Sequence, residues 1–153
     1  MVMLTEVQLE QLQRLSRKPR NKEVPAIVKE LFLNHKVSQH EKIIDELDKP
    51  FEFKRYVRAS RDSILSALKT IEALNQLHLS EDSVSKAYFE LILALYQYQP
   101  STDTKRHLEL LVLHHVPAST VADVTNTSIQ QLSRTLKQYN DKVKMIEDIR
   151  AHF

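Results

Sequence analysis

The chain has 153 residues, of which 42% are hydrophobic and 27% are charged, and its formal net charge is +2. This composition is typical of one ordinary globular domain or two very small ones, and it excludes a disordered chain. The sequence has no glycine and no cysteine, which excludes Gly-rich nucleotide-binding loops, disulfides, thiolate nucleophiles and Cys-ligated zinc.

Helical periodicity runs along the whole chain and predicts an all-α fold. Thr5, Ser80 and Ser101 are suitable N-caps, and Pro117 also stands just before a predicted helix. Residues 16–22 and 97–104 are predicted loops. We expect helices over residues 5–15, 23–35, 38–47, 58–76, 81–97, 102–115, 118–125 and 128–150.

Two clusters in the first half allow more than one interpretation. A basic loop is either an arm that binds DNA phosphates or a solvated connector; it contains Arg14, Arg17, Lys18, Arg20 and Lys22. Three aromatic residues are interpreted as core, because RNA-binding modules usually present a base-stacking platform on a sheet. These residues are Phe51, Phe53 and Tyr56.

The last predicted helix carries a narrow apolar stripe close to the a/d pattern of a coiled coil. Such a stripe needs a partner, which is either another helix of the same chain or a second subunit. The stripe consists of Ile129, Leu132, Leu136, Tyr139, Val143, Ile146, Ile149 and Phe153.

The two halves of the sequence resemble each other. The segment Leu4-Thr-Glu is similar to Leu79-Ser-Glu, and the segment 30–37 is similar to 109–116 at an offset of 79 residues. The same offset aligns Phe53 with Leu132 and Val57 with Leu136. We expect a tandem duplication, residues 1–78 and 79–153, with the two similar helical halves packed together. The alternative is a chance match of two amphipathic halves.

Residues 117–137 have the pattern of a helix–turn–helix. Ala122 is the small residue required where the helices cross, and Asn126 tolerates the left-handed conformation of the turn. Ser128 can cap the second helix. Apolar side chains would lock the two helices together: Val121, Leu132 and Leu136, with Val124 and Ile129 as further candidates.

Two positions in this window depart from the usual pattern. Thr125 and Thr127 occupy places where aliphatic residues are common, so we expect a less well packed turn. The alternative to a helix–turn–helix is an ordinary corner between two helices.

The solvent face of the second helix is predicted to contact DNA. Gln can read adenine, Arg can bind guanine through two hydrogen bonds, and Ser and Lys reach bases or phosphates. Ser119 and Thr120, at the start of the first helix, could bind phosphates. The predicted contacts in the second helix are Ser128, Gln130, Gln131, Ser133, Arg134, Lys137 and Gln138.

The stretch from Pro117 to Leu136 resembles, without gaps, the helix–turn–helix of TrfB/KorA-type plasmid repressors. It is similar in the same register to PapB-type regulators of bacterial adhesin genes. The resemblance covers about 75 residues of the second half and implies an all-α, homodimeric or oligomeric transcription regulator. It also implies that residues 128–137 contact double-stranded DNA.

The first half departs from this pattern. Ile43 stands at the position of Ala122, Leu47 at that of Asn126, and Pro50 falls where the recognition helix should begin. A bulky residue at the crossing and a turn residue that does not favour the left-handed conformation argue against a second working motif. We therefore expect residues 1–78 to be a degenerate repeat that serves as a docking surface.

No catalytic, cofactor or metal site is predicted. The sequence has no HExxH motif, the adjacent His114 and His115 point in different directions on a helix, and no nucleophile elbow occurs. No signal peptide is expected from the first residues, and the sequence has no apolar stretch of about 18 residues. We expect a cytoplasmic, non-enzymatic DNA-binding regulator without a small-molecule substrate. The alternative is a helical protein–protein interaction module, such as an antirepressor, adaptor or accessory factor.

Overall fold

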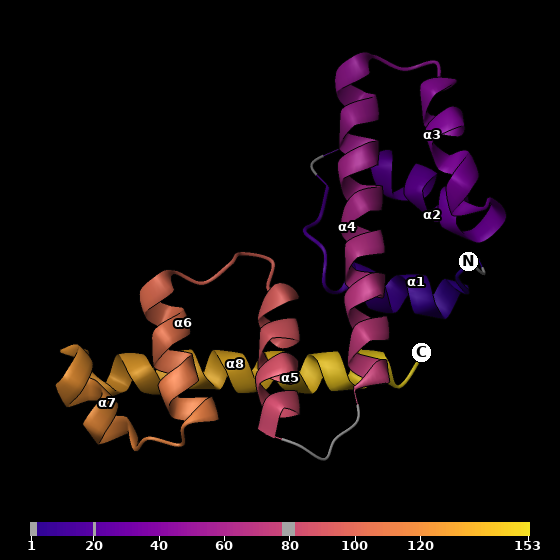
Figure 1. Ribbon diagram of the computed structural model, residues 1–153. Coiled ribbons are helices and arrows are strands. Elements are labelled where there is room, and N and C mark those ends of the chain that lie inside the picture. The colour runs from indigo at the N-terminus through magenta and orange to yellow at the C-terminus, as the bar shows by residue number, and fades with distance from the viewer. Residues whose placement is uncertain (1–2, 20, 78–81) are drawn as a thin grey trace. The chain divides into compact units, whose positions relative to one another are not determined.

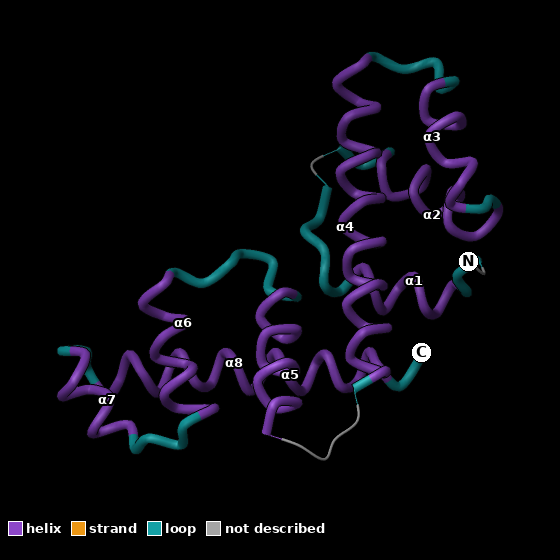
Figure 2. Tube along the Cα trace, in the orientation of Figure 1, coloured by secondary structure: helices purple, strands orange, loops and turns teal. Residues whose placement is uncertain are grey.

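The computed structural model describes residues 3–19, 21–77 and 82–153. Over these residues the protein is all-helical and contains no strand (Figures 1 and 2), so the predicted fold class is confirmed. Arg20 of the basic loop, and the Leu79-Ser-Glu opening with the predicted cap Ser80, lie outside the described residues. The helices are α1 Glu6–Gln13, α2 Val24–Asn34, α3 Val37–Asp45, α4 Phe51–Gln76, α5 Asp82–Ala94, α6 Thr102–Leu108, the π-helix η1 Glu109–Leu113, α7 Ala118–Thr125 and α8 Ile129–Arg150.

The chain divides into two compact units. Unit 1 runs to Glu72 and also contains His152–Phe153, and unit 2 is Ala73–Ala151. The division lies inside α4 and not at residues 78 and 79. The order of helices is similar in both units: shifted by 79 residues, α2 covers 103–113, which is the extent of α6 and η1 to within a residue. The duplication itself stays a prediction.

Unit 1 is built around the buried faces of α1 to α4. Thr5 caps α1 through its hydroxyl, which accepts from the Gln8 amide at 3.2 Å, while the Gln8 side chain accepts from the Thr5 amide. This reciprocal pair satisfies two amides at the helix start. The core side chains include Leu9, Leu12, Val28, Leu31, Phe32, Ile44, Val57, Ile64 and Ile71.

Helix α4 begins earlier than the predicted residue 58. Pro50 precedes Phe51, and its carbonyl accepts the first helical hydrogen bond from the Lys54 amide at 3.2 Å. Proline is favourable at a helix start because its fixed φ suits the helix and no amide is lost. The core face of α4 then passes through Phe53, Val57 and Ile64.

The predicted burial of all three aromatic residues near residue 50 is only partly correct. Phe53 is buried, but Phe51 is 76% exposed and Tyr56 is 44% exposed. At 100° per residue, Phe51 and Tyr56 point away from the core face of α4, centred on Phe53, Val57 and Ile64, by roughly 140° and 80°. An early helix start thus places two aromatic side chains in solvent.

His40 is a completely buried histidine in unit 1. Its Nε2 lies 2.9 Å from the Leu31 carbonyl, and Phe32 packs edge-on at 5.0 Å between ring centroids. Among the described residues its Nδ1 has no hydrogen-bond partner. Burial therefore lowers the pKa of His40 below its usual 6.5, although the hydrogen bond to Leu31 opposes the shift. The Leu31 contact makes Nε2 the donor in the neutral ring.

We expect acid to destabilise unit 1 through His40. Below about pH 6.5 the unfolded chain binds a proton at this side chain while the folded chain resists it, so the free energy of unfolding falls as the pH falls toward the folded pKa. Urea unfolding at several pH values should show this loss. His40→Gln should make the loss of stability between neutral pH and about pH 4.5 smaller, in the range where carboxylates stay charged. His114→Gln, at an exposed histidine, should leave that loss unchanged. Equal acid sensitivity in all three proteins would contradict the prediction.

Candidate nucleic-acid interface

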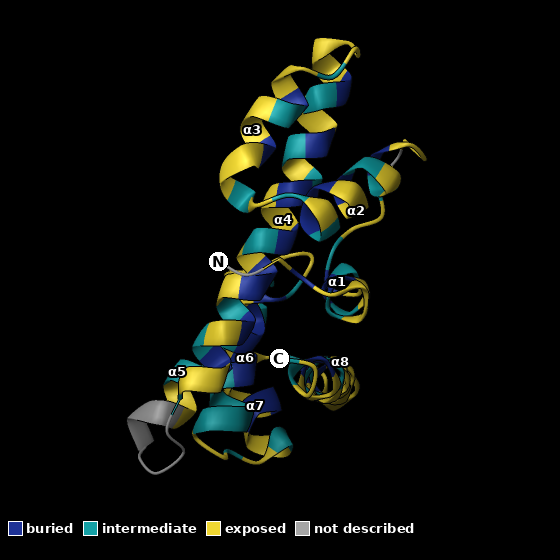
Figure 3. Ribbon diagram, turned by 90° about the vertical axis from the view of Figure 1, so that its right-hand side faces the viewer, coloured by how far each residue is buried: buried dark blue, intermediate teal, exposed yellow. Residues whose placement is uncertain are grey.

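Helix α8 is the central helix of unit 2, because it packs against α5, α6 and α7. Its predicted stripe is largely buried: Leu132, Tyr139, Ile146 and Ile149 face the interior. Buried and exposed positions lie on opposite sides of this helix in Figure 3. The stripe therefore has its partners among helices of the same chain.

The turn between α7 and α8 has the geometry that the sequence predicts. Asn126 adopts φ 53° and ψ 44°, in the left-handed region. The amides of Asn126 and Thr127 both donate to the Ala122 carbonyl, the latter at 3.0 Å. Two residues later Ser128 caps α8, its hydroxyl accepting from the Gln131 amide at 3.1 Å. The chain thus ends one helix and starts the next within three residues.

The apolar lock of this corner differs in part from the prediction. Val121, Ala122 and Leu132 form a buried cluster, and Leu136 is half-buried. Val124 and Ile129 are exposed, so their assignment to the lock is wrong. Their places are taken by side chains from the preceding segment, which the sequence reasoning missed: Leu110, Leu111 and Val116.

A π-helical turn explains how the preceding segment reaches the corner. The predicted helix 102–115 ends in η1, where the His114 amide donates to the Glu109 carbonyl at 3.1 Å. The Val116 amide donates to the Leu110 carbonyl at 2.9 Å, and His115 has φ 51°. The widened turn changes the helical phase, so Leu110, Leu111 and Val116 pack on the cluster. A regular 3.6-residue pattern does not predict this phase.

The two threonines of the turn replace aliphatic packing with hydrogen bonds. Thr125 Oγ1 donates to the Val121 carbonyl at 2.6 Å and lies 3.0 Å from Thr127 Oγ1. Thr127 Oγ1 lies 3.4 Å from Nε2 of His107, a buried residue of α6. The turn is therefore held by polar contacts to α6 as well as by its apolar cluster.

All nine predicted contact residues are exposed on this corner. Gln130, Arg134 and Lys137 lie on the outer side of the first three turns of α8, opposite the buried Leu132. Lys137 pairs with Asp141 at 3.0 Å, and both side chains are largely exposed. The remaining members are Ser119, Thr120, Ser128, Gln131, Ser133 and Gln138. All nine residues are thus accessible, seven at the start of α8 and two at the start of α7.

The corresponding corner of unit 1 has a different geometry. Helix α3 is followed by Glu46 in the right-handed region, φ −83° and ψ −4°, and the chain needs residues 46–50 to reach α4. Among the described residues only His115 and Asn126 have positive φ. Leu47 therefore does not adopt the left-handed conformation seen at Asn126. This agrees with the prediction, because a leucine side chain does not favour that conformation.

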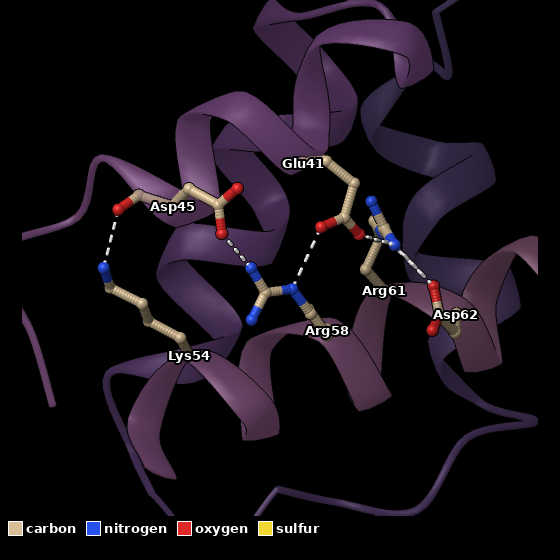
Figure 4. Close-up of polar contacts among 6 residues, drawn as sticks. All are labelled: Glu41, Asp45, Lys54, Arg58, Arg61 and Asp62. Atoms are coloured by element: carbon tan, nitrogen blue, oxygen red, sulfur yellow. Dashed lines mark hydrogen bonds and ion pairs between the residues drawn. The ribbon is translucent and has the colours of Figure 1, made fainter. Parts of the chain in front are cut away.

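Ion pairs hold α3 against α4 in unit 1 (Figure 4). Arg58 binds Glu41 at 3.0 Å and also contacts Asp45, while Lys54 Nζ donates to the Asp45 carbonyl at 2.6 Å. Arg61, mostly buried, binds Glu41 at 2.5 Å and Asp62 at 2.8 Å. The two guanidinium groups lower the pKa of Glu41. Arg58 and Arg61 of α4 are thus engaged with neighbouring acidic side chains.

Asn126 provides a direct test of the corner. Replacement by glycine should leave the free energy of unfolding unchanged or raise it, because glycine adopts positive φ without a steric cost. Asn126→Ala should lower it by about 1 kcal/mol, the cost of a Cβ in the left-handed region. Thermal unfolding followed by circular dichroism measures both. An alanine variant as stable as the glycine variant would contradict the assigned conformation.

Neither a metal site nor a membrane span is found among the described residues. No three His, Asp or Glu side chains gather closely enough to hold an ion. None of the described helices is long and apolar enough to cross a membrane. Comparison of the chain with family models, with curated proteins and with solved structures finds no match.

Proposed function

We propose that the chain is a sequence-specific, duplex-DNA-binding transcription regulator. In this proposal α7 and α8 act as a helix–turn–helix, and residues 128–138 enter the major groove. The resemblance to plasmid repressors extends the proposal to repression by a cytoplasmic homodimer. Unit 1 would then be a docking repeat, since its own corner lacks the tight turn and Arg58 and Arg61 of α4 are paired with Glu41.

The observation that carries this proposal is the polar, exposed start of α8 directly after a tight turn. Gln130 and Arg134 are side chains that can read base edges through paired hydrogen bonds. Residues 128–138 span about 15 Å along the helix axis, and a helix of about 10–12 Å diameter fits the major groove. Ser119 and Thr120, exposed at the start of α7, suit phosphate contacts.

Asp141, the acidic partner of Lys137, does not prevent such contacts. Asp141 lies about 18 Å along the helix from Ile129, beyond the segment proposed to enter the groove. Lys137 would exchange its exposed partner Asp141 for a phosphate. An exposed pair four residues apart on a helix contributes only about 0.3–0.5 kcal/mol, so the exchange costs little.

The proposal is tested by selecting binding sites from a pool of random duplexes with the full-length protein. Enrichment of one consensus, with affinity that falls steeply as salt rises, is expected, because neutralised phosphates release counterions. A palindromic consensus would support the homodimer. Failure to enrich any sequence, together with weak binding at low salt, would contradict DNA recognition.

A second candidate function is a helical protein–protein interaction module. It is favoured by the exposed aromatic side chains Phe51 and Tyr56 on the first turns of α4, since exposed aromatic residues are common at protein interfaces. Such a module should show a defined protein partner in a pull-down and little affinity for duplex DNA. Phe51→Ala should then abolish capture of that partner.

A further inference from the structure

Two aliphatic side chains stand uncovered on either side of the α7–α8 turn. Val124, in the last turn of α7, is 73% exposed, and Ile129, the first residue of α8, is 52% exposed. The corner has a core of its own, in which Val121 and Leu132 are fully buried. The exposure of Val124 and Ile129 therefore does not reflect a corner that lacks packing.

Each exposed aliphatic residue is aligned with a polar residue of the proposed DNA surface. Residues four apart share one face of a helix. Ile129 is in line with Ser133 and Lys137 on α8, and Val124 is in line with Thr120 on α7. These polar residues are themselves exposed. The two aliphatic groups thus continue the surface that the proposed function assigns to DNA.

The major groove offers a specific partner for an aliphatic side chain. Its base edges present hydrogen-bond donors and acceptors, and the C5-methyl group of thymine is the apolar group among them. A branched side chain at the first residue of a recognition helix lies where that helix approaches the bases. Burying Ile129 against a methyl group would remove apolar surface of both from water.

We propose that Ile129 reads a thymine by packing against its C5-methyl group, with Val124 forming the adjacent apolar wall. The inference rests on the proposed function and deepens it. Ile129 is then a specificity-determining residue that adds an apolar contact to the polar contacts of Gln130 and Arg134.

The experiment uses the full-length protein and the single duplex most enriched by the selection. Each thymine is replaced in turn by deoxyuridine, which removes the methyl group and keeps the base-pairing edge. At one position the wild-type affinity should fall about fourfold, the effect of one buried methyl-sized group. The Ile129→Ala variant should bind the thymine duplex more weakly than the wild type does. Replacing that thymine by deoxyuridine should not weaken the binding of the variant any further.

Val124→Ala is expected to weaken binding less than Ile129→Ala. Val7→Ala is the matched control, since Val7 is likewise an exposed valine on a helix, in unit 1, and its truncation should not change the affinity. Equal wild-type affinity for every deoxyuridine duplex would overturn the inference while leaving DNA recognition intact. An Ile129→Ala variant that keeps the methyl dependence would overturn it too. Failure of the selection itself would instead overturn the proposed function, and this inference with it.

Discussion

Replacing Arg134 with alanine is expected to weaken binding of the preferred duplex by about 1–3 kcal/mol, or roughly 5- to 150-fold in Kd. The side chain is exposed on the second turn of α8, where a guanidinium can bind two acceptors of one guanine. The loss should be concentrated on one base pair, so preference at that position should relax. Fluorescence anisotropy with the preferred duplex and its single-base variants measures both effects.

Lys137→Ala should behave differently, because an exposed ammonium is suited to phosphate and not to a base. Binding should weaken similarly for all duplexes, and the slope of log affinity against log salt should become shallower by about 0.9.

The chain offers two controls for these variants. Arg55 is an exposed arginine of α4 that aligns with Arg134 at the offset of 79, and Lys144 is an exposed lysine farther along α8. Arg55→Ala and Lys144→Ala should leave both the affinity for the preferred duplex and the slope of log affinity against log salt close to the wild-type values. If Arg134→Ala and Lys137→Ala together bind as the wild type does, α8 is not the recognition helix.

The largest effect on stability is expected for Leu132→Ala. Leu132 is fully buried in the cluster with Val121 and Ala122. Truncation removes buried methyl groups and leaves a cavity, which lowers the free energy of unfolding by about 2–5 kcal/mol. Urea unfolding measures the loss, and hydrogen exchange should place it in α7 and α8. Binding to the preferred duplex should weaken as well, because the corner would no longer hold α8 at one angle.

Ile129→Ala is the matched control, three residues earlier on the same helix. Its side chain is exposed, so its truncation should change the free energy of unfolding by no more than about 0.5 kcal/mol. Comparable destabilisation by both substitutions would mean that Ile129 is part of the corner's core. That result would contradict the burial assigned to the two residues and would remove the basis for a methyl contact at Ile129.

The features that the sequence predicts correctly are those set by local interactions. The positive φ at Asn126 follows from a side chain that tolerates it, and the start of α8 follows from the hydroxyl of Ser128. Caps and turn conformations involve residues only a few positions apart, so they can be read from a short window. Helical period also predicts the exposed face at the start of α8, which carries seven of the nine polar residues of the proposed interface; the other two, Ser119 and Thr120, lie at the start of α7.

Tertiary structure decides which apolar residues close the corner. Val124 and Ile129 lie inside the helix–turn–helix window and Val116 lies just outside it, yet Val116 packs on the core and the other two are exposed. Leu110 and Leu111 of η1 pack on this cluster, and His107 of α6 contacts Thr127 of the turn, all from outside the window. Likewise, it is the packing of α3 on α4 that pairs Arg58 and Arg61 with Glu41 in unit 1. Sequence period therefore determines the helices and their polar face, whereas the phase between segments, and with it the exposure of Ile129, arises only when distant helices pack together.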